Sequence, residues 1–291
     1  MKGHCLVLFL TGLLFAYADA QMALPASGPP QEGVDVTTPE AGGEHLRIET
    51  RHGPLNLWRP SNYDPRTAGI VVYIHGYFTS VDQTWTDDQL AKQFHDSGRN
   101  ALFIAIEAPQ SNHQDVSWKS LEDLMRTVED RAPYPLPRGP LVVVSHGGGY
   151  RTLLLWLGDP HLQYVILLDG LYAGQAEFRS WLRPHPRTKP HRMVLVAGDT
   201  WQQSSQFARR IYGTARRRKI PANPSSFTPR ETHARLLYLR SQYDHNEIIS
   251  NGKVIPVLLQ ISPLRALAAP RPRPAKRAGH KPPLHYRLSF Q

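Results

Sequence analysis

The feature of this sequence that most constrains its fold is an alternation of short apolar runs with segments of helical period. The runs are rich in Val, Ile and Leu and almost free of polar residues, which is typical of strands buried on both faces of a parallel sheet. This alternation predicts an α/β fold, in which a mostly parallel central sheet is flanked by helices. The predicted strands are residues 70–74, 101–106, 141–144, 164–168, 193–197 and 235–239.

The segments between these strands repeat apolar residues at the spacing of amphipathic helices. Upstream of the first strand, residues 45–50 and 55–58 have the pattern of an antiparallel hairpin that leads into the sheet. The predicted helices lie around Leu90 and Phe94, over Trp118–Val128, over Tyr150–Leu157 and over Lys253–Leu259.

The first twenty residues have the pattern of a secretory signal peptide. Lys2 precedes an apolar run from Leu6 to Tyr17, and small residues at 18 and 20 suit cleavage near Ala20. We therefore expect a secreted or periplasmic protein, with a retained N-terminal anchor as the alternative. The one cysteine, Cys5, lies inside this segment, so the mature chain would have no disulfide, thiolate metal site or cysteine nucleophile.

The remaining chain divides by composition into three parts. Residues 21–43 are rich in Pro, Gly, Ala and Thr and are expected to be flexible, and residues 44–262 form the predicted domain. Residues 263–291 form a basic, proline-rich tail that is expected to be disordered. Much of the net charge of +10 lies in this tail, which either contacts an anionic surface or is simply solvated. No specific nucleic-acid binding is expected, because no recognition fold is visible.

Polar and glycine residues follow the predicted strands directly. In an open α/β sheet, ligands bind beyond the carboxyl ends of the strands, so these residues are the first candidates for a site. They are His75-Gly76-Tyr77-Phe78, Glu107, Ser145 to Tyr150, Asp169-Gly170, Gly198-Asp199 and, after the last strand, His245.

This order resembles the α/β-hydrolase superfamily over about residues 46–261. The resemblance implies the α/β-hydrolase fold and a turn of the form G-x-S-x-G that carries a nucleophilic serine, followed by an acid and a histidine. On this pattern Asp199 matches the acid and His245 the base. Backbone N–H groups of Tyr77 or Phe78, together with Gly148, would form the oxyanion hole.

The chain departs from the family's pattern at the nucleophile. The matching turn is Ser145-His146-Gly147-Gly148-Gly149, which puts Gly147 where the serine would be. Glycine adopts the strained backbone of such a turn readily, so its shape can persist without its chemistry. Ser145 is the nearest alternative nucleophile, but it lies at the end of a strand and therefore deeper in the sheet.

Two functions remain open at this point. The chain is either an exported, bacterial-type hydrolase-like pseudoenzyme that binds a small-molecule or acyl-type ligand, or an ester or amide hydrolase that uses His245 and Asp199 with an activated water or a relocated serine. Glu107 is a second acid, a substrate anchor or a structural carboxylate, and Asp169 is an alternative orienting acid or a turn residue. We expect no cofactor and no metal, because no ligand spacing stands out. A basic cluster at Arg209, Arg210 and residues 216–219 suits a solvated helix face or an anion-binding patch.

Overall fold

The computed structural model describes residues 35–183 and 190–268. The predicted signal peptide, its cleavage near Ala20 and most of the basic tail lie outside the described residues. Contacts divide the chain after residue 31, so all the described residues belong to the second unit. In the described ranges, none of the helices has the length and apolar character that a membrane span requires.

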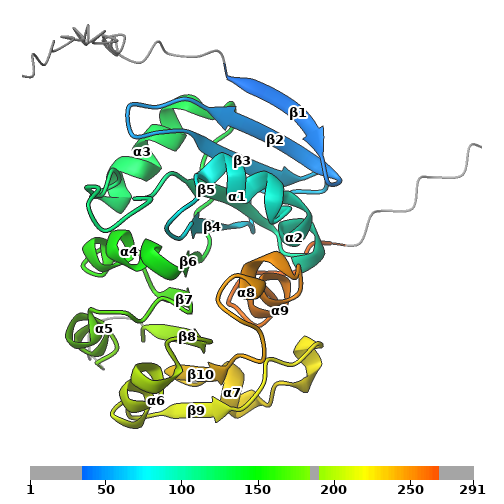
Figure 1. The fold of residues 1–291 in the computed structure, drawn as a ribbon. Helices are drawn as coiled ribbons and strands as arrows, with labels where there is room; N and C mark the ends of the chain where they lie inside the picture. The colour runs from blue at the N-terminus through cyan, green and yellow to red at the C-terminus, as the bar shows by residue number, and fades with distance from the viewer. Residues whose placement is uncertain (1–34, 184–189, 269–291) are drawn as a thin grey trace, which may run out of the picture. The chain divides into compact units, whose positions relative to one another are not determined.

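A ten-stranded sheet runs through the described unit in the order β1-β2-β3-β5-β4-β6-β7-β8-β10-β9 (Figure 1). The pairs β1-β2, β2-β3 and β3-β5 are antiparallel, and the other pairs are parallel. The predicted mostly parallel sheet is confirmed. The strands are β1 Val36–Glu40, β2 Gly43–Ile48, β3 Leu55–Pro60, β4 Gly69–Ile74, β5 Ala101–Ile106, β6 Leu141–His146, β7 Tyr164–Leu168, β8 Arg192–Ala197, β9 Thr214–Arg217 and β10 Leu236–Arg240.

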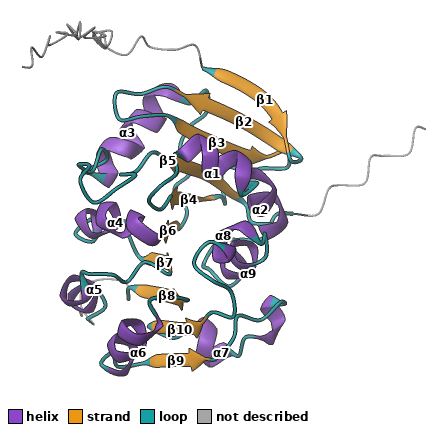
Figure 2. Cartoon of the chain, in the orientation of Figure 1, coloured by secondary structure: helices purple, strands orange, loops and turns teal. Residues whose placement is uncertain are grey.

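Helices cover both faces of this sheet, with α3 to α6 on one side and α1, α2, α8 and α9 on the other (Figures 1 and 2). Short 3-10 turns occur at Gly147–Gly149 and Pro224–Ser226. The helices are α1 Val81–Asp87, α2 Leu90–Ser97, α3 Leu121–Arg131, α4 Tyr150–Trp156, α5 Gln175–Trp181, α6 Trp201–Arg209, α7 Pro229–Thr232, α8 Glu247–Ser250 and α9 Val254–Gln260.

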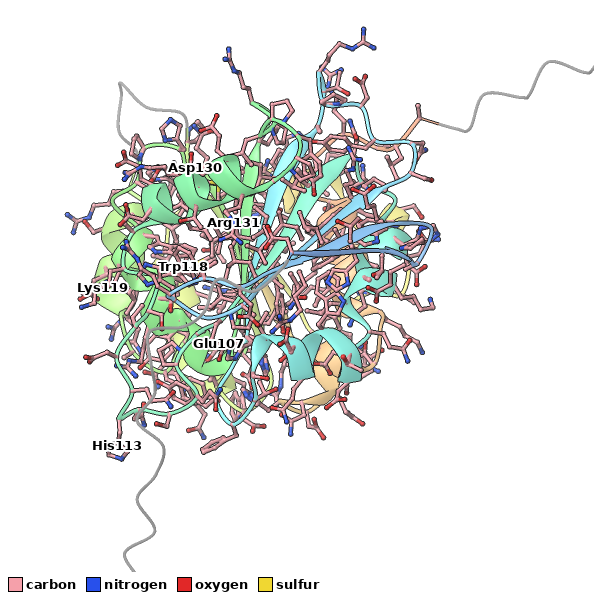
Figure 3. The ribbon with its side chains drawn as sticks, turned by 90° about the horizontal axis from the view of Figure 1, so that it is seen from above. Glu107, His113, Trp118, Lys119, Asp130 and Arg131 are labelled. Carbon is pink, nitrogen blue, oxygen red and sulfur yellow. The ribbon has the colours of Figure 1, made fainter. Side chains whose placement is uncertain are left out.

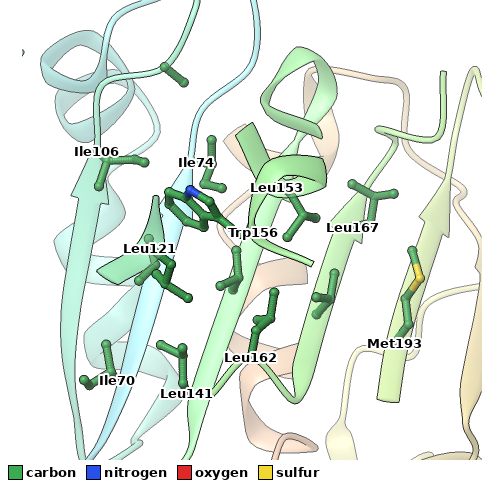
Figure 4. Close-up of a cluster of buried hydrophobic side chains, with 14 of the residues drawn as sticks. Ile70, Ile74, Ile106, Leu121, Leu141, Leu153, Trp156, Leu162, Leu167 and Met193 are labelled. Atoms are coloured by element: carbon green, nitrogen blue, oxygen red, sulfur yellow. The ribbon is translucent and has the colours of Figure 1, made fainter. Parts of the chain in front are cut away.

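The two faces of the sheet bury separate hydrophobic cores. Successive side chains of a strand point to opposite faces, and in β4 Ile70, Val72 and Ile74 enter one core while Val71 and Tyr73 enter the other. The first core, part of which is drawn in Figure 4, packs the sheet against α3 to α6. The second packs it against α1, α2, α8 and α9. Burial on both faces explains why the strands read as continuous apolar runs.

The helix predicted from Trp118 begins later, at Leu121. Ser120 caps it, because its side chain accepts a hydrogen bond from the N–H of Asp123. Trp118 lies in the preceding loop (Figure 3) and is buried. The carbonyl oxygen of Trp118 accepts a hydrogen bond from Nε1 of Trp156 at 2.9 Å.

The structure corrects the boundaries expected at both ends of the domain. Residues 36–40 of the segment expected to be flexible form strand β1, which pairs with β2 at the edge of the sheet. The start of the expected tail is also ordered: Leu264 is buried, and the N–H of Leu267 donates to the carbonyl of Gly98 at 2.8 Å. Composition did not reveal either feature: β1 pairs with the neighbouring strand β2, and the start of the tail is held by contacts distant in sequence.

A further correction concerns the second basic cluster. Residues 214–217 form β9, an edge strand that pairs in parallel with β10, rather than part of a helix face. The strand is short and polar on its exposed side, so it lacks the apolar pattern that identified the others.

Candidate active site

The turn after β6 brings Gly147 to the carboxyl edge of the sheet, between that strand and α4. Its backbone has φ +47°, a left-handed conformation that favours glycine. A Cβ atom built at this position would lie 3.0 Å from Nε2 and 3.1 Å from Cε1 of His245. The turn therefore presents position 147 directly to a histidine ring, with no side chain of its own to meet it.

His245 follows β10 and precedes α8, and its ring is fixed by a buried carboxylate. Its Nδ1 lies 2.8 Å from Oδ2 of Asp169, which is fully buried at the end of β7. A carboxylate can only accept, so Nδ1 carries the proton and donates it to Asp169. In the neutral ring this leaves Nε2, the atom that faces Gly147, as a proton acceptor.

Asp169 is held as an anion by a set of converging donors. Its oxygens also accept hydrogen bonds from the N–H groups of Gly198, Asp199 and Thr200 and, at 2.6 Å, from the hydroxyl of Thr200. Burial alone would raise the pKa of Asp169, but the hydrogen bonds from His245 and Thr200 hold that pKa well below its usual range. The carboxylate is therefore charged throughout the physiological range.

The acid expected to pair with His245 was Asp199, and the structure corrects this. Both aspartates follow neighbouring strands, β7 and β8, but the backbone after β7 turns inward at Asp169, where φ is +46°. Asp199 contributes its N–H to Asp169, and its side chain is exposed. Asp169, which was expected only as an alternative orienting acid, is thus the carboxylate that pairs with His245.

His146 supports the loop that carries His245. Its Nε2 donates to the carbonyl oxygen of His245 at 3.0 Å, and the two rings pack with centroids 4.4 Å apart. Burial and the neighbouring His245 lower the pKa of His146 to about 3, so its ring stays neutral. It acts here as a packing residue.

From β2 onward, the sheet begins with the antiparallel strands β2 and β3 and continues with parallel strands, in which β5 precedes β4. The elbow at Gly147, the carboxylate of Asp169 and the ring of His245 follow β6, β7 and β10. The chain has the α/β-hydrolase fold. In this fold the elbow residue is normally a serine, whereas here it is Gly147.

Comparisons with known proteins returned structures of hydrolases. One is an S-formylglutathione hydrolase from Agrobacterium tumefaciens, with 10% identity, a TM-score of 0.48 and coverage of 79% of this chain and 99% of that chain. Another is a feruloyl esterase module from Clostridium thermocellum, with 13% identity, a TM-score of 0.49 and coverage of 78% and 88%. A third is the S-formylglutathione hydrolase FrmB from Staphylococcus aureus, with 12% identity, a TM-score of 0.48 and coverage of 80% and 99%. No protein-family model and no curated protein matches the chain.

A cleft of about 740 Å³ opens over the α/β-hydrolase elbow and exposes His245. Aromatic rings and carboxylates dominate its wall, and no Lys or Arg is among its lining residues within the described ranges. Its volume is in the range of small-molecule sites. The aromatic residues are Tyr77, Phe78, Tyr150 and Tyr172, and the acidic ones are Asp87, Asp88 and Asp199.

The backbone N–H groups expected to form an oxyanion hole are those of Tyr77, Phe78 and Gly148. The N–H of Phe78 donates to the carbonyl of Gln110 at 2.9 Å, so it is already used and the expectation for Phe78 is wrong. Its side chain is 92% exposed at the cleft, on a backbone with φ +64°. Tyr77 and Gly148 both line the cleft, and the Tyr77 ring packs directly on Gly148, where a Cβ would lie 2.3 Å from it.

Ser145 lies away from this chemistry. It is fully buried in β6, and its Oγ has no hydrogen-bond partner among the described residues. It does not line the cleft. The expectation that it could replace the missing nucleophile is therefore not supported by its position.

Glu107 is a structural carboxylate rather than a wall of the cleft. Its Oε2 accepts from the N–H of Val81 at 2.9 Å, at the start of α1, and its Oε1 accepts from Gln110 at 3.1 Å (Figure 3). His75 lies beside it at 3.4 Å, and the Nε2 of His75 accepts from the N–H of Ala108 at 2.8 Å. Although burial opposes it, the hydrogen bonds from Val81 and Gln110 lower the pKa of Glu107. These contacts shape the loops beside the elbow.

Asp169, Asp199 and His245 also bring potential metal-ligand atoms within 4.8 Å of one another. The Asp169 oxygens, however, already accept from main-chain N–H groups and from His245 Nδ1. The donor set is thus satisfied as an acid–histidine pair.

Several cleft residues were not predicted, among them Asp88 and Tyr172. Asp88 ends α1, and burial together with the neighbouring Asp87 raises its pKa to about 6. Tyr172 places its hydroxyl 3.4 Å from Nδ1 of His245, and burial raises its pKa to about 12. Both lie in loops or helix ends, where only the fold brings them to the histidine.

Proposed function

We propose that this chain is an exported, hydrolase-like pseudoenzyme whose cleft binds a small, acyl-type ligand without forming a covalent intermediate. The observation that carries the proposal is Gly147. A covalent mechanism needs a hydroxyl or thiol that His245 Nε2 can deprotonate. Position 147, which faces Nε2, is a glycine and has neither group.

The lining of the cleft limits the charge of this ligand. Carboxylates of Asp87, Asp88 and Asp199 face the space, and no Lys or Arg among the described lining residues offsets them, so an anionic ligand would be repelled. Aromatic rings beside carboxylates favour apolar groups and organic cations. We therefore infer a neutral or cationic ligand.

A second function is favoured by the intact pairing of Asp169 with His245. In this alternative His245 Nε2 accepts a proton from a water molecule while the water oxygen bonds to an ester or amide carbonyl carbon. The resulting oxyanion would be stabilised by N–H groups at Tyr77 and Gly148, and the proton would then pass from Nε2 to the leaving group. Such a hydrolase would act without an acyl-enzyme.

Hydrolysis of p-nitrophenyl esters with short and medium acyl chains separates the two functions. The pseudoenzyme proposal predicts no His245-dependent turnover by the wild type, measured against His245→Ala. Turnover that disappears in His245→Ala would contradict it and establish the alternative. Gly147→Ser measures whether the cleft still accepts the ester, and Gly147→Ala is its matched control for backbone strain.

The charge of the ligand is tested by calorimetry with three esters of similar size. One is a cationic choline ester, one is a neutral ester of the same acyl chain, and one is an anionic hemisuccinate. The proposal predicts that the choline ester or the neutral ester binds and that the hemisuccinate does not. Preferential binding of the anionic compound would overturn the inference about charge.

A further inference from the structure

A second concavity, of about 450 Å³, lies between α6 and the strands β9 and β10, and it shares no lining residue with the cleft. We call it the arginine groove, because four arginines whose guanidinium groups make no ion pair among the described residues dominate its wall. Its principal residues are Trp201, Arg209, Arg216, Arg218, Tyr238 and Arg240.

The periodicities of three elements bring these side chains together. Tyr238 and Arg240 are two residues apart on β10, so they point to one face of the sheet, and Arg216 lies on β9. Arg218, which directly follows β9, lines the same groove. The strands pair with Tyr238 opposite Arg216.

On α6 the matching positions are Trp201, Ser205 and Arg209, which are four residues apart and lie on one side of the helix. The adjoining side of α6 buries Ser204, Phe207 and Ala208. The same helix thus faces the core with one side and the arginine groove with the other.

The positive charge of the arginine groove is almost uncompensated. Arg217 is paired with Glu231 at 2.9 Å, whereas Arg209, Arg216, Arg218 and Arg240 form no ion pair with any described residue. Arg240 lies over the Trp201 ring at 4.3 Å. Burial raises the pKa of Tyr238, and the charges of Arg240, Arg216 and Arg209, which line the same groove, oppose that rise.

Guanidinium groups that converge without acidic partners repel one another and are stabilised by an anion placed between them. Arginine binds phosphate and sulfate oxygens through paired hydrogen bonds. The groove has the volume of a small-molecule site rather than that of an extended surface. We infer that the arginine groove binds a small ligand with several phosphate or sulfate groups.

The inference is tested by titrating the full-length chain with inorganic triphosphate in a calorimeter, at constant ionic strength. We expect saturable binding, with Kd at least about tenfold weaker in Arg209→Ala and in Arg216→Ala. Arg210→Ala is the matched control, because it also removes one positive charge. Arg210 is next to Arg209 in the sequence and is exposed, but it does not line the groove. Its Kd should change less than about twofold.

Arg216→Lys keeps the charge but loses the paired geometry, and it should weaken binding nearly as much as Arg216→Ala. Thermal unfolding of each variant shows whether the fold is retained. Three results would overturn the inference: no saturable binding of triphosphate, equal losses in Arg210→Ala and Arg209→Ala, or binding of a heparin oligosaccharide through these arginines without binding of triphosphate. The last would assign the surface to a polymer.

Discussion

A Cβ atom at Gly147 would lie 3.0 Å from Nε2 of His245. In the neutral ring this nitrogen carries no proton, because Nδ1 donates its proton to Asp169. The α/β-hydrolase fold here holds the Asp169–His245 pair against the elbow, where residue 147 is a glycine. This juxtaposition separates the shape of the site from its covalent chemistry.

Replacing Asp169 with Asn should lower the free energy of unfolding at pH 7 by about 2–4 kcal/mol, because buried N–H donors and the His245 ring lose an anionic acceptor. The pKa of Asp169 is lower in the folded state than in the unfolded state. Its stabilisation is therefore present above about pH 4 and is lost as the pH falls through the folded pKa. Urea unfolding between pH 3 and 6 should show a weaker pH dependence in Asp169→Asn than in the wild type; equal slopes would contradict the assignment.

Asp88 should have the opposite effect on stability. Its pKa is raised to about 6 in the folded state, so the folded chain retains a proton that the unfolded chain has released. Stability should then fall as the pH rises from about 4 to 6. Asp88→Asn removes this loss and should raise the free energy of unfolding at pH 7 by about 1 kcal/mol, after allowance for solvent screening. Asp199→Asn, at an exposed carboxylate of the same cleft, is the control and should leave stability nearly unchanged.

Much of this arrangement could be predicted from the sequence, because it is encoded locally. The apolar runs identified β4 to β8 and β10, and the resemblance of the residues after those strands to the α/β-hydrolase pattern pointed to His245 and to the elbow at Gly147. The choice between Asp169 and Asp199 could not be predicted, because both follow strands and only the three-dimensional course of the turns decides which reaches the histidine. The use of the Phe78 N–H by Gln110 depends on a contact distant in sequence and was equally hidden.

Ser145→Ala tests whether the buried hydroxyl of Ser145 contributes to stability or to ester hydrolysis. Its Oγ is buried without a partner among the described residues, so its removal should leave the free energy of unfolding unchanged or raise it by up to about 1 kcal/mol. Any ester hydrolysis by the wild type should persist in this variant. A complete loss of turnover would instead mark Ser145 as a relocated nucleophile.

Gly148→Ala should be destabilising by about 1–3 kcal/mol, because the new methyl group would lie 2.3 Å from the Tyr77 ring. In Tyr77→Ala the ring is gone, and the same substitution at Gly148 should then cost much less. A double-mutant cycle by chemical denaturation measures this coupling. Additive effects would show that the ring does not pack on Gly148 as described.

Intact-mass analysis after treatment with a fluorophosphonate tests the central claim most directly, because this reagent bonds covalently to serine oxygens activated by a histidine. The account predicts no adduct on the wild type, an adduct at position 147 in Gly147→Ser, and none in Gly147→Ser combined with His245→Ala. A His245-dependent adduct on the wild type would contradict the account, because it would show that this α/β-hydrolase fold has kept a working nucleophile elsewhere.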